Sequence, residues 1–308
     1  MMAERLDGKA LAKSIRARLA ERIEREGLRP GLLLIRVGED PASVVYVGGK
    51  EKASKQVGIA SRVEVMPEST SESALLARIA EANEDPSVHG ILVQLPVPKQ
   101  IDPDRIAEAI APHKDVDGLH PINQGFLTLG APRLVSCTPL GVLALLHRYE
   151  VPLSGRHVVV LGRSQIVGRP LSVLLGLKAP WADATVTVCH SRSKGWESLT
   201  READVVIAAM GRPEAVTGQH IRPGAAVVDV GIHRIPRDHG KDALVGDVHA
   251  ESVEPVAGFL SPVPGGVGPL TIALLLTNTV YSALASAGKA GTSGPVEFAL
   301  EMADVTSR

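Results

Sequence analysis

The chain has 308 residues, of which 44% are hydrophobic and only 3% aromatic, so it can bury a sizeable core made mainly of aliphatic side chains. Its formal net charge of −1 argues against a nucleic-acid partner or an anionic membrane surface, because both require concentrated positive charge. Cys137 and Cys189 are too few for a disulfide framework, and no apolar run reaches the roughly 18 to 20 residues of a membrane span. We expect a cytoplasmic globular protein without a signal peptide.

The first region of the chain alternates strand and helix patterns. Helices are predicted at residues 6–26, 41–57, 71–83 and 102–110, and strands at residues 31–37, 62–66 and 90–95. Asp40 is the expected N-cap of the second helix, with Pro41 at its first position and Gly58 at its end. Strands separated by helices predict βαβ units and therefore a parallel sheet.

Residues 111–132 are rich in Gly, Pro, Asn and Asp, and we interpret them as a connecting or site-forming loop. Beyond it, helices are predicted at residues 138–149 and 270–287, and strands at residues 157–161, 185–189, 204–208 and 225–230. A linker at 288–295 precedes a tail that is either disordered or a short helix. The predicted fold class is α/β, with two α/β domains, the second a Rossmann-like parallel sheet, and a cleft between them.

The strand at residues 157–161 leads into a glycine loop. Gly162 ends the apolar run and Gly168 opens a helical segment, a layout that presents backbone N–H groups and a helix N-terminus to a phosphate. Ser164 occupies the middle position of the dinucleotide fingerprint, and Arg169 follows where a Walker loop has lysine. The spacing alone therefore fits a phosphate loop and an ordinary βα turn equally well.

The second strand of this series ends without a carboxylate. NAD-preferring folds usually carry Asp or Glu there, whereas this chain has His190, Ser191 and Arg192. Because arginine pairs with phosphate, the sequence favours NADP over NAD, unless these arginines are solvated surface charges. His190 follows Cys189, but no ligand spacing supports a metal site.

The helix after Asp40 carries a lysine on an otherwise apolar stripe. At about 100° per residue, Tyr46, Lys50, Ala53 and Val57 share one face. Desolvation on such a face would lower the pKa of Lys50, as an acid/base near neutral pH requires. The alternative is a lysine whose charged end reaches solvent. Two mid-helix glycines at residues 48–49 each cost about 1 kcal/mol relative to alanine.

Three further features could form a ligand site. Gln94 is the polar residue at the carboxyl end of a predicted parallel strand, where α/β sheets bind ligands, or else it is a core amide. Asp115 and Asp117 stand in a glycine-ended loop that also fits a plain turn. The loop at residues 264–269 contains enough glycine for something to approach its backbone closely.

Together these stretches resemble the bifunctional methylenetetrahydrofolate dehydrogenase/cyclohydrolase family. The resemblance runs in family order from about residue 6 to residue 287. It rests on the motifs at residues 37–43, 46–50, 93–96, 114–118, 137–139, 162–170, 188–191, 228–231 and 264–269. Departures include Gly48–Gly49, Ser136 where proline is frequent, His233 where asparagine is frequent, and Leu270 where methionine is frequent.

The resemblance implies NADP-dependent oxidation of 5,10-methylenetetrahydrofolate to 5,10-methenyltetrahydrofolate, followed by hydrolysis to 10-formyltetrahydrofolate. Lys50 would be the acid/base of the cyclohydrolase step, and Gln94 would hydrogen-bond to it. Tyr46 would pack on the folate, while Asp117, or else Asp115, would anchor the pterin. The implied substrate-binding residues are Tyr46, Lys50, Val93, Gln94, Leu95, Asp117, Pro264, Gly265 and Gly266.

The resemblance also implies a division of the chain. A folate-binding catalytic domain would comprise residues 1–137 and 268–308, and an NADP-binding domain residues 138–267, usually in a homodimer. Arg163 and Ser191 would lie near the 2′-phosphate. The implied cofactor-binding residues are Gly162, Arg163, Ser164, Ile166, Val167, Gly168, Pro170, His190, Ser191, Arg192, Gly231 and Ile232. The alternatives are a monofunctional dehydrogenase, another NAD(P) oxidoreductase of this fold, or a nucleotide-binding module without turnover.

Overall fold

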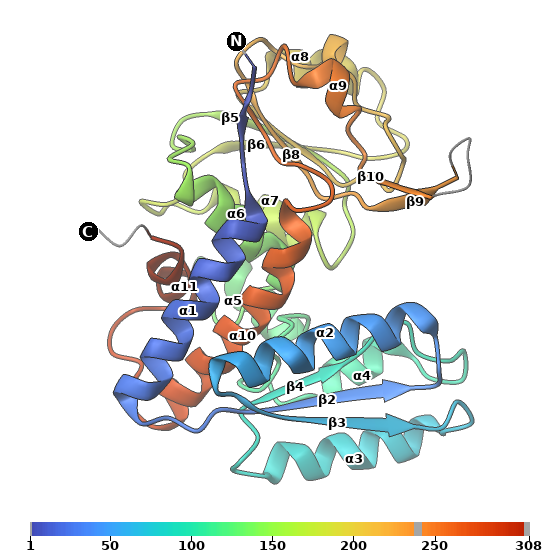
Figure 1. The fold of residues 1–308 in the computed structure, drawn as a ribbon, viewed down its shortest axis with the longest axis vertical. Coiled ribbons are helices and arrows are strands. Elements are labelled where there is room, and N and C mark those ends of the chain that lie inside the picture. The colour runs from blue at the N-terminus through green and yellow to red at the C-terminus, as the bar shows by residue number, and fades with distance from the viewer. Residues whose placement is uncertain (1, 237–241, 305–308) are drawn as a thin grey trace. The chain divides into compact units, whose positions relative to one another are not determined.

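A computed structural model of the chain describes residues 2–236 and 242–304, which form two compact units (Figure 1). The six-stranded unit gathers the described residues of Met1–Ala12, Thr138–Thr271 and Ala303–Arg308. The three-stranded unit gathers Lys13–Cys137 and Ile272–Met302. These bounds differ from the predicted domain division at the N-terminus, because strand β1 (Glu4–Arg5) pairs with strand β11 (Phe259–Leu260) of the six-stranded sheet.

The three-stranded unit is built around strand β2 (Gly31–Val37), which lies between β3 (Ala60–Met66) and β4 (Gly90–Val93), all parallel. Helices α2 (Pro41–Val57) and α3 (Glu72–Glu84) lie on opposite faces of this sheet (Figure 1). With helices on both faces, all seven residues of β2 are buried, which explains its continuous apolar sequence. Helix α4 (Pro103–Ala109) contributes Ile106 to the same core as α3.

The predicted ends of α2 are confirmed. The Asp40 carboxylate accepts a hydrogen bond from the Ser43 backbone N–H at 2.8 Å, and Pro41 takes the first helical position. Gly58 ends the helix in the left-handed region with φ 85°, where a side chain would be strained. These caps fix where α2 begins and ends, and therefore which of its side chains face the sheet.

Residues 111–132 are not a continuous loop, so that prediction is wrong in part. Helix α5 (Pro121–Thr128) lies within them, and α6 (Cys137–Arg148) follows. The signal was weak because α5 is short and its N-cap is His120, whose ring Nδ1 accepts from the Ile122 N–H at 3.0 Å. Ser, Thr, Asp and Asn are the usual caps, so the sequence lacked the common start signal.

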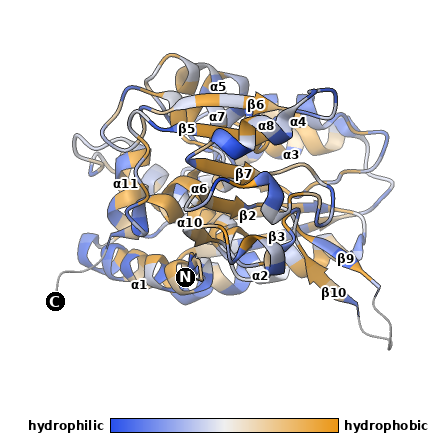
Figure 2. Cartoon of the chain, turned by 90° about the horizontal axis from the view of Figure 1, so that it is seen from above, coloured by the Kyte–Doolittle hydropathy of each residue, from blue (hydrophilic) through white to orange (hydrophobic). Residues whose placement is uncertain are grey.

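The six-stranded sheet is parallel throughout, in the order β1-β11-β8-β7-β5-β6. Its predicted strands are β5 (His157–Leu161), β6 (Thr185–Cys189), β7 (Val205–Ala208) and β8 (Ala226–Asp229). Helix α7 (Gly168–Gly176) follows β5. Strand β7 is hydrophobic throughout and β5 is hydrophobic after its first residue, His157, as expected for strands covered on both faces (Figure 2).

Several short elements of this unit were not predicted. They include β1 and β11, each two residues long, and an antiparallel hairpin. The others are β9 (His233–Ile235) and β10 (Ala243–Val245) of the hairpin, α8 (Trp196–Glu202), α9 (Ala250–Val253) and the 3₁₀ helix η1 (Gly218–His220). Elements this short carry too few residues for a periodic pattern.

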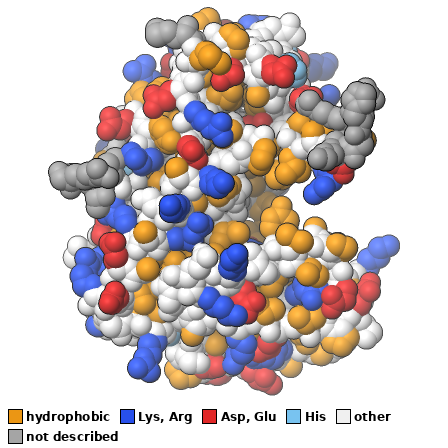
Figure 3. All heavy atoms as spheres, viewed as in Figure 1, with side chains coloured by type: hydrophobic (Ala, Val, Ile, Leu, Met, Phe, Trp, Pro, Cys, Tyr) orange, Lys and Arg blue, Asp and Glu red, His pale blue; other side chains and the backbone are white. Residues whose placement is uncertain are grey.

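Three helices complete the chain: α1 (Gly8–Glu26), α10 (Val267–Ser286) and α11 (Pro295–Ala303). Of the two alternatives for the tail, the helix is correct for residues 295–303. Within the described ranges, α10 is the one helix long and apolar enough to cross a membrane, but 72% of its apolar window is buried inside the fold. It is therefore typical of a core helix. On the surface shown in Figure 3, positive and negative side chains are interspersed, in keeping with the net charge of −1.

Candidate functional site

The three-stranded unit brings Lys50 and Gln94 together. Helix α2 carries Lys50 toward the carboxyl end of the sheet, where Gln94 directly follows strand β4. The Lys50 Nζ donates a hydrogen bond to the Gln94 Oε1 at 2.9 Å, and the Gln94 Nε2 donates to the Leu95 carbonyl at 2.7 Å. The glutamine amide is therefore held by its own backbone, and its oxygen is aimed at the lysine.

Burial controls the charge of Lys50. It lowers the pKa of the Lys50 ammonium below its ordinary value, while the nearby Asp117 carboxylate acts in the opposite direction. Burial also raises the pKa of Asp117, although the Lys50 charge and a hydrogen bond from the Cys137 thiol lower it. The pKa of Cys137 itself is raised well above its ordinary value, so this buried thiol is not a nucleophile near neutral pH.

The structure separates the roles of the two candidate aspartates. Asp115 is buried, and its Oδ2 accepts from the His120 N–H and from the Asn123 side-chain amide, both at 2.8 Å. It therefore stabilises the turn into α5. Asp117 instead interacts electrostatically with Lys50, so it is the aspartate that belongs to the lysine cluster.

Asn278, which was not selected from the sequence, and Gly118 shape the loop that carries Asp117. Asn278, a fully buried residue of α10, donates to the carbonyls of Val116 and Val135 at 2.9 Å each. Gly118 has φ +68°, and a Cβ there would lie 2.4 Å from the Ser136 nitrogen. The polar run at residues 277–279 within an otherwise apolar helix was the signal that could have identified Asn278.

The remaining substrate-binding candidates of this unit differ in exposure. Tyr46 is 49% exposed and Leu95 38% exposed, so both offer apolar surface to a ligand. Val93 is buried in the core of the sheet, so its side chain packs in the core next to Gln94 rather than facing a ligand. Pro264, Gly265 and Gly266 belong to the other compact unit, together with all the candidate cofactor residues.

The glycine loop of the six-stranded unit is tightly folded. Gly162 has φ +132°, and a Cβ there would lie 2.1 Å from the Ala209 carbonyl oxygen. A Cβ on Gly168 would lie 2.1 Å from the Gly162 carbonyl oxygen. Within the loop, the Ser164 Oγ accepts from the Val167 N–H at 3.2 Å. The two glycines therefore let three backbone segments meet at the carboxyl edge of the sheet, directly before helix α7.

This edge also exposes apolar side chains and arginines. Ile166 and Ile232, in the loops after β5 and β8, are each 51% exposed, and Val188 of β6 is 38% exposed. Large apolar residues left open at the carboxyl ends of parallel strands are typical of a ligand surface. Among the candidate cofactor residues here, Arg163, Ser164, Ser191 and Arg192 are exposed, whereas Gly168 and Pro170 are buried. The others lie in the turns that follow the strands: Gly162, Val167, His190, Gly231 and Ile232.

Two buried carboxylates near this edge were also not selected from the sequence. Asp229 ends β8 and Asp247 follows β10, and both are almost completely buried. Burial raises the pKa of Asp229 to about 7, against the lowering effect of the backbone N–H groups of Val248, Asp247 and Gly231. The signal in the sequence was a carboxylate directly after an apolar strand.

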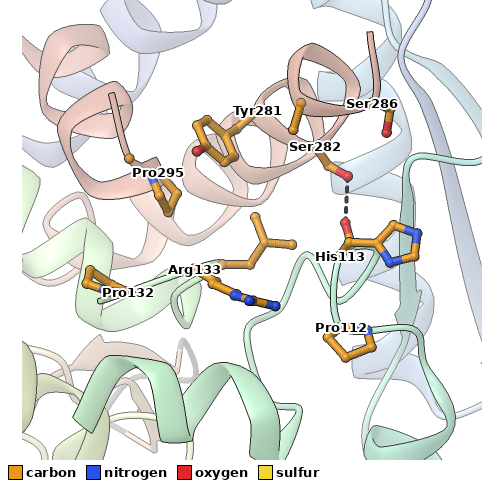
Figure 4. Close-up of a pocket in the computed structure, with 11 residues that line it drawn as sticks. Pro112, His113, Pro132, Arg133, Tyr281, Ser282, Ser286 and Pro295 are labelled. Carbon is orange, nitrogen blue, oxygen red and sulfur yellow. Dashed lines mark hydrogen bonds between the residues drawn. The ribbon is translucent and has the colours of Figure 1, made fainter. Parts of the chain in front are cut away.

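A separate cavity of ≈ 440 Å³ lies in the three-stranded unit, between α10, the start of α11 and two loops (Figure 4). Arg133, Tyr281 and Pro295 are among the residues that line it, and no predicted site residue is. The Arg133 guanidinium lies 3.6 Å from the centre of the Phe126 ring. Among the described residues, no group of three or more His, Cys, Asp or Glu side chains is placed to hold a metal ion.

One unit thus presents a desolvated lysine with an amide and a carboxylate, and the other a parallel sheet with a glycine loop. These features are typical of an α/β enzyme that binds a dinucleotide. Two family models match the chain. Residues 6–117 match the catalytic domain of tetrahydrofolate dehydrogenase/cyclohydrolase, and residues 136–287 match its NAD(P)-binding domain.

Known proteins agree with this match. The bifunctional protein FolD of Cereibacter sphaeroides is 52% identical over 285 residues, which cover 91% of this chain and 94% of that protein. The crystal structure of the bifunctional enzyme FolD from Campylobacter jejuni has a TM-score of 0.86 and 46% identity, covering 91% of this chain and 98% of that one. The Trypanosoma brucei enzyme, solved with NADP cofactor and inhibitor, has a TM-score of 0.87 and 37% identity, covering 93% and 99%.

The chain belongs to the tetrahydrofolate dehydrogenase/cyclohydrolase family. The predicted family and the α/β fold class with a Rossmann-like second domain are confirmed. The predicted bifunctional folate chemistry and the choice of NADP as cofactor are confirmed as well. The domain boundaries and the roles of individual residues stay predictions.

Proposed function

We propose that the chain oxidises 5,10-methylenetetrahydrofolate with NADP and then hydrolyses the methenyl product to 10-formyltetrahydrofolate, with Lys50 as the acid/base of hydrolysis. The 2.9 Å hydrogen bond between Lys50 and Gln94, on a lysine whose pKa is lowered by burial, carries this proposal. A surface lysine would stay charged and hydrated, whereas this one can exist as a neutral amine at a lower pH.

Hydrolysis requires a proton to leave a water molecule as its oxygen attacks the electron-poor methenyl carbon. The neutral Lys50 amine can accept that proton, and the resulting ammonium can return it to the ring nitrogen as its bond to carbon breaks. The second proton of the water leaves to solvent as the formyl C=O forms. The Gln94 oxygen accepts a hydrogen bond from the amine in either protonation state, so it holds the nitrogen in one direction throughout. Asp117 favours the ammonium once it forms.

The same cluster supplies contacts for the folate. We propose that the Asp117 carboxylate pairs with the donor edge of the pterin, because a charged acceptor forms the stronger hydrogen bonds there. The half-exposed ring of Tyr46 offers a flat apolar face on which an aromatic part of the substrate can pack. Both residues belong to the unit that carries Lys50.

The glycine loop fits a dinucleotide. The turn folds so tightly that a Cβ at Gly162 or Gly168 would collide with a backbone carbonyl oxygen, and exposed residues that include Arg163 and Arg169 border it before the N-terminus of α7. We propose that this loop holds the diphosphate, that Arg163, Ser191 and Arg192 lie near the 2′-phosphate, and that Ile166 and Ile232 cover apolar parts of the cofactor. The chemistry that NADP supplies when bound is acceptance of a hydride from the one-carbon unit.

The proposal is tested by incubating purified protein with 5,10-methylenetetrahydrofolate and either NADP or NAD, while reduced cofactor is followed by its absorbance. We expect reduced cofactor to form, with a higher kcat/KM for NADP than for NAD. A parallel assay of methenyltetrahydrofolate without cofactor should show hydrolysis above the spontaneous rate. Failure of both cofactors to support oxidation would contradict the dehydrogenase, and an unaccelerated hydrolysis would contradict the cyclohydrolase.

We also propose that the chain acts as a homodimer in the cytoplasm. Two buried cysteines without a disulfide support a reducing compartment, and the family resemblance supports the dimer. Light scattering during gel filtration measures the molar mass, and a value of one chain would contradict the dimer. Fractionation of the source cells tests the compartment.

A further inference from the structure

The Asp247 carboxylate collects donors from two separate segments of the six-stranded unit. It is 0% exposed, and it accepts from the backbone N–H groups of Met210, Gly211 and Arg212 in the loop after β7. It also accepts from the His233 ring Nε2 at 2.7 Å, at the base of the β9–β10 hairpin. Four donors meet at this one side chain, where an asparagine of the same shape would turn an NH₂ group toward at least one of them.

A second buried carboxylate fixes the position of the first. Asp229 accepts from the backbone N–H groups of Asp247 and Val248 and from that of Gly231, each at 2.9 Å. Its own N–H donates to the Ser261 Oγ at 2.8 Å. The two aspartates therefore tie the end of β8, the end of β10 and the loop after β7 into a single network.

The glycines around this network show how closely the segments pack. A Cβ on Gly231 would lie 2.5 Å from the Asp247 Oδ1, and a Cβ on Gly246 would lie 1.8 Å from the Asp229 Oδ2. Such distances are far below ordinary contact, so the backbone must approach the carboxylates without a side chain between them. The turn at Gly231 is thus shaped by Asp247 as well as by its own sequence.

The network reaches the glycine loop through one residue. Ala209 directly precedes the three N–H groups that Asp247 holds, and a Cβ on Gly162 would lie 2.1 Å from the Ala209 carbonyl oxygen. The Ala209 N–H donates to the Leu161 carbonyl at 2.8 Å, next to the start of the loop. A shift of residues 210–212 would therefore displace Ala209 against the first glycine of the candidate phosphate loop.

We propose that Asp247 is a positioning residue of the NADP site, which sets the turns at residues 209–212 and Gly231 so that the Gly162 loop keeps its binding geometry. This inference rests on the proposed placement of NADP at that loop. Asp247 does not itself reach the surface, so it acts on the cofactor through the backbone. His233 completes the network from the partly exposed side.

The test uses the two activities of one enzyme as an internal control. In Asp247→Asn the side chain keeps its shape, but an amide NH₂ now faces at least one backbone N–H, so those turns must shift. We expect the KM for NADP in the dehydrogenase reaction to rise about tenfold or more. The KM for methylenetetrahydrofolate and the rate of methenyltetrahydrofolate hydrolysis measured without NADP should stay within about twofold of wild type.

An unchanged KM for NADP in an Asp247→Asn enzyme that still hydrolyses the methenyl substrate would overturn the inference. If instead the Asp247→Asn variant loses both activities, substitutions of His233 provide the test, because this residue is partly exposed and lies outside the core. His233→Leu removes one donor and should raise the KM for NADP about threefold or more, whereas His233→Asn restores a donor and should stay near wild type. Equal KM values for these two variants would then overturn it.

The matched control is Asp242→Asn, which removes a carboxylate next to the same hairpin. Asp242 is exposed and pairs only loosely with Arg234, at 3.7 Å. We expect no change in either KM. Because the wild-type assays alone decide whether the chain is a dehydrogenase and cyclohydrolase, failure of the proposed function and failure of this inference give different results.

Discussion

The lysine cluster and the glycine loop solve the problem of holding a ligand in opposite ways. At Lys50, Gln94 and Asp117, charged and polar side chains meet, and burial tunes the pKa of two of them. At Gly162 and Gly168, the essential feature is the absence of side chains, since a Cβ at either would lie 2.1 Å from a carbonyl oxygen. The first region therefore depends on its side chains, and the second on the close approach of its own backbone segments.

Because the two regions are built differently, substitutions in them should impair the enzyme in different ways. Replacing a side chain of the lysine cluster removes a chemical group but leaves the backbone where it was. Adding a methyl group to the glycine loop removes no group but forces backbone segments apart. The two activities let these failures be separated, because we propose that hydrolysis uses the lysine cluster without a cofactor, whereas oxidation requires NADP at the glycine loop.

The largest effect is expected from Lys50→Gln. Without the amine, the cluster loses the group that we propose takes the proton from water, so kcat for methenyltetrahydrofolate hydrolysis should fall about 100- to 10,000-fold. Binding of NADP, measured by fluorescence or calorimetry, should remain at the wild-type level. Lys52→Gln is the matched control, because Lys52 is exposed on the same helix and should leave hydrolysis unchanged. Normal hydrolysis by Lys50→Gln would exclude Lys50 as the acid/base.

Gly168→Ala should produce the opposite pattern. The new Cβ would contact the Gly162 carbonyl, so the loop must open and the dissociation constant of NADP should rise about 10- to 100-fold. Hydrolysis without cofactor should persist. Gly176→Ala serves as control, because a Cβ at this other glycine of α7 meets its nearest neighbour at 3.9 Å, an ordinary contact. Equal affinities of the two variants for NADP would contradict the role of the loop.

A smaller effect is expected on the pH dependence of hydrolysis. Because the Lys50 amine must be neutral to accept a proton, kcat should rise as pH passes through its pKa, below the ordinary lysine value of about 10.4. Asp117 stabilises the ammonium and raises that pKa, so Asp117→Asn should lower it. The rising limb should then move to lower pH. A limb that stays in place, or moves to higher pH, would show that the two charges are not coupled.

Much of this site could be predicted from the sequence, because its residues follow strands and helices with clear patterns. Lys50 was found from its place on an apolar stripe, and Gln94 from its position at a strand end. Their direct hydrogen bond was implied only by the family resemblance, since the two residues lie 44 positions apart. The strand, glycine loop and helix at residues 157–176 were also predicted from the sequence, but their spacing fitted a phosphate loop and an ordinary turn equally well. The arginines and the missing carboxylate after strand β6 then favoured NADP binding.

The remaining parts depend on tertiary packing that leaves little trace in a single sequence. Asn278 donates to a loop 143 residues away at Val135, and the polar run around it in α10 does not indicate which loop it contacts. Asp247 follows a strand of three residues, which is too short for a periodic pattern. Asp115 and Asp117 could not be told apart because both stand in the same turn, and only their burial and partners separate them.

The smallest effect is expected at Gly48, a glycine on the helix that carries Lys50. A Cβ on Gly48 would meet nothing within 4 Å, so this mid-helix glycine is not required for packing. Gly48→Ala should therefore raise the free energy of unfolding by about 0.5 to 1 kcal/mol, measured by urea denaturation. Gly27→Ala is the control: it has equally open surroundings but φ +61°, so the same change should destabilise the protein. A loss of stability in Gly48→Ala would mean that glycine serves the backbone near Lys50 as it does at Gly162.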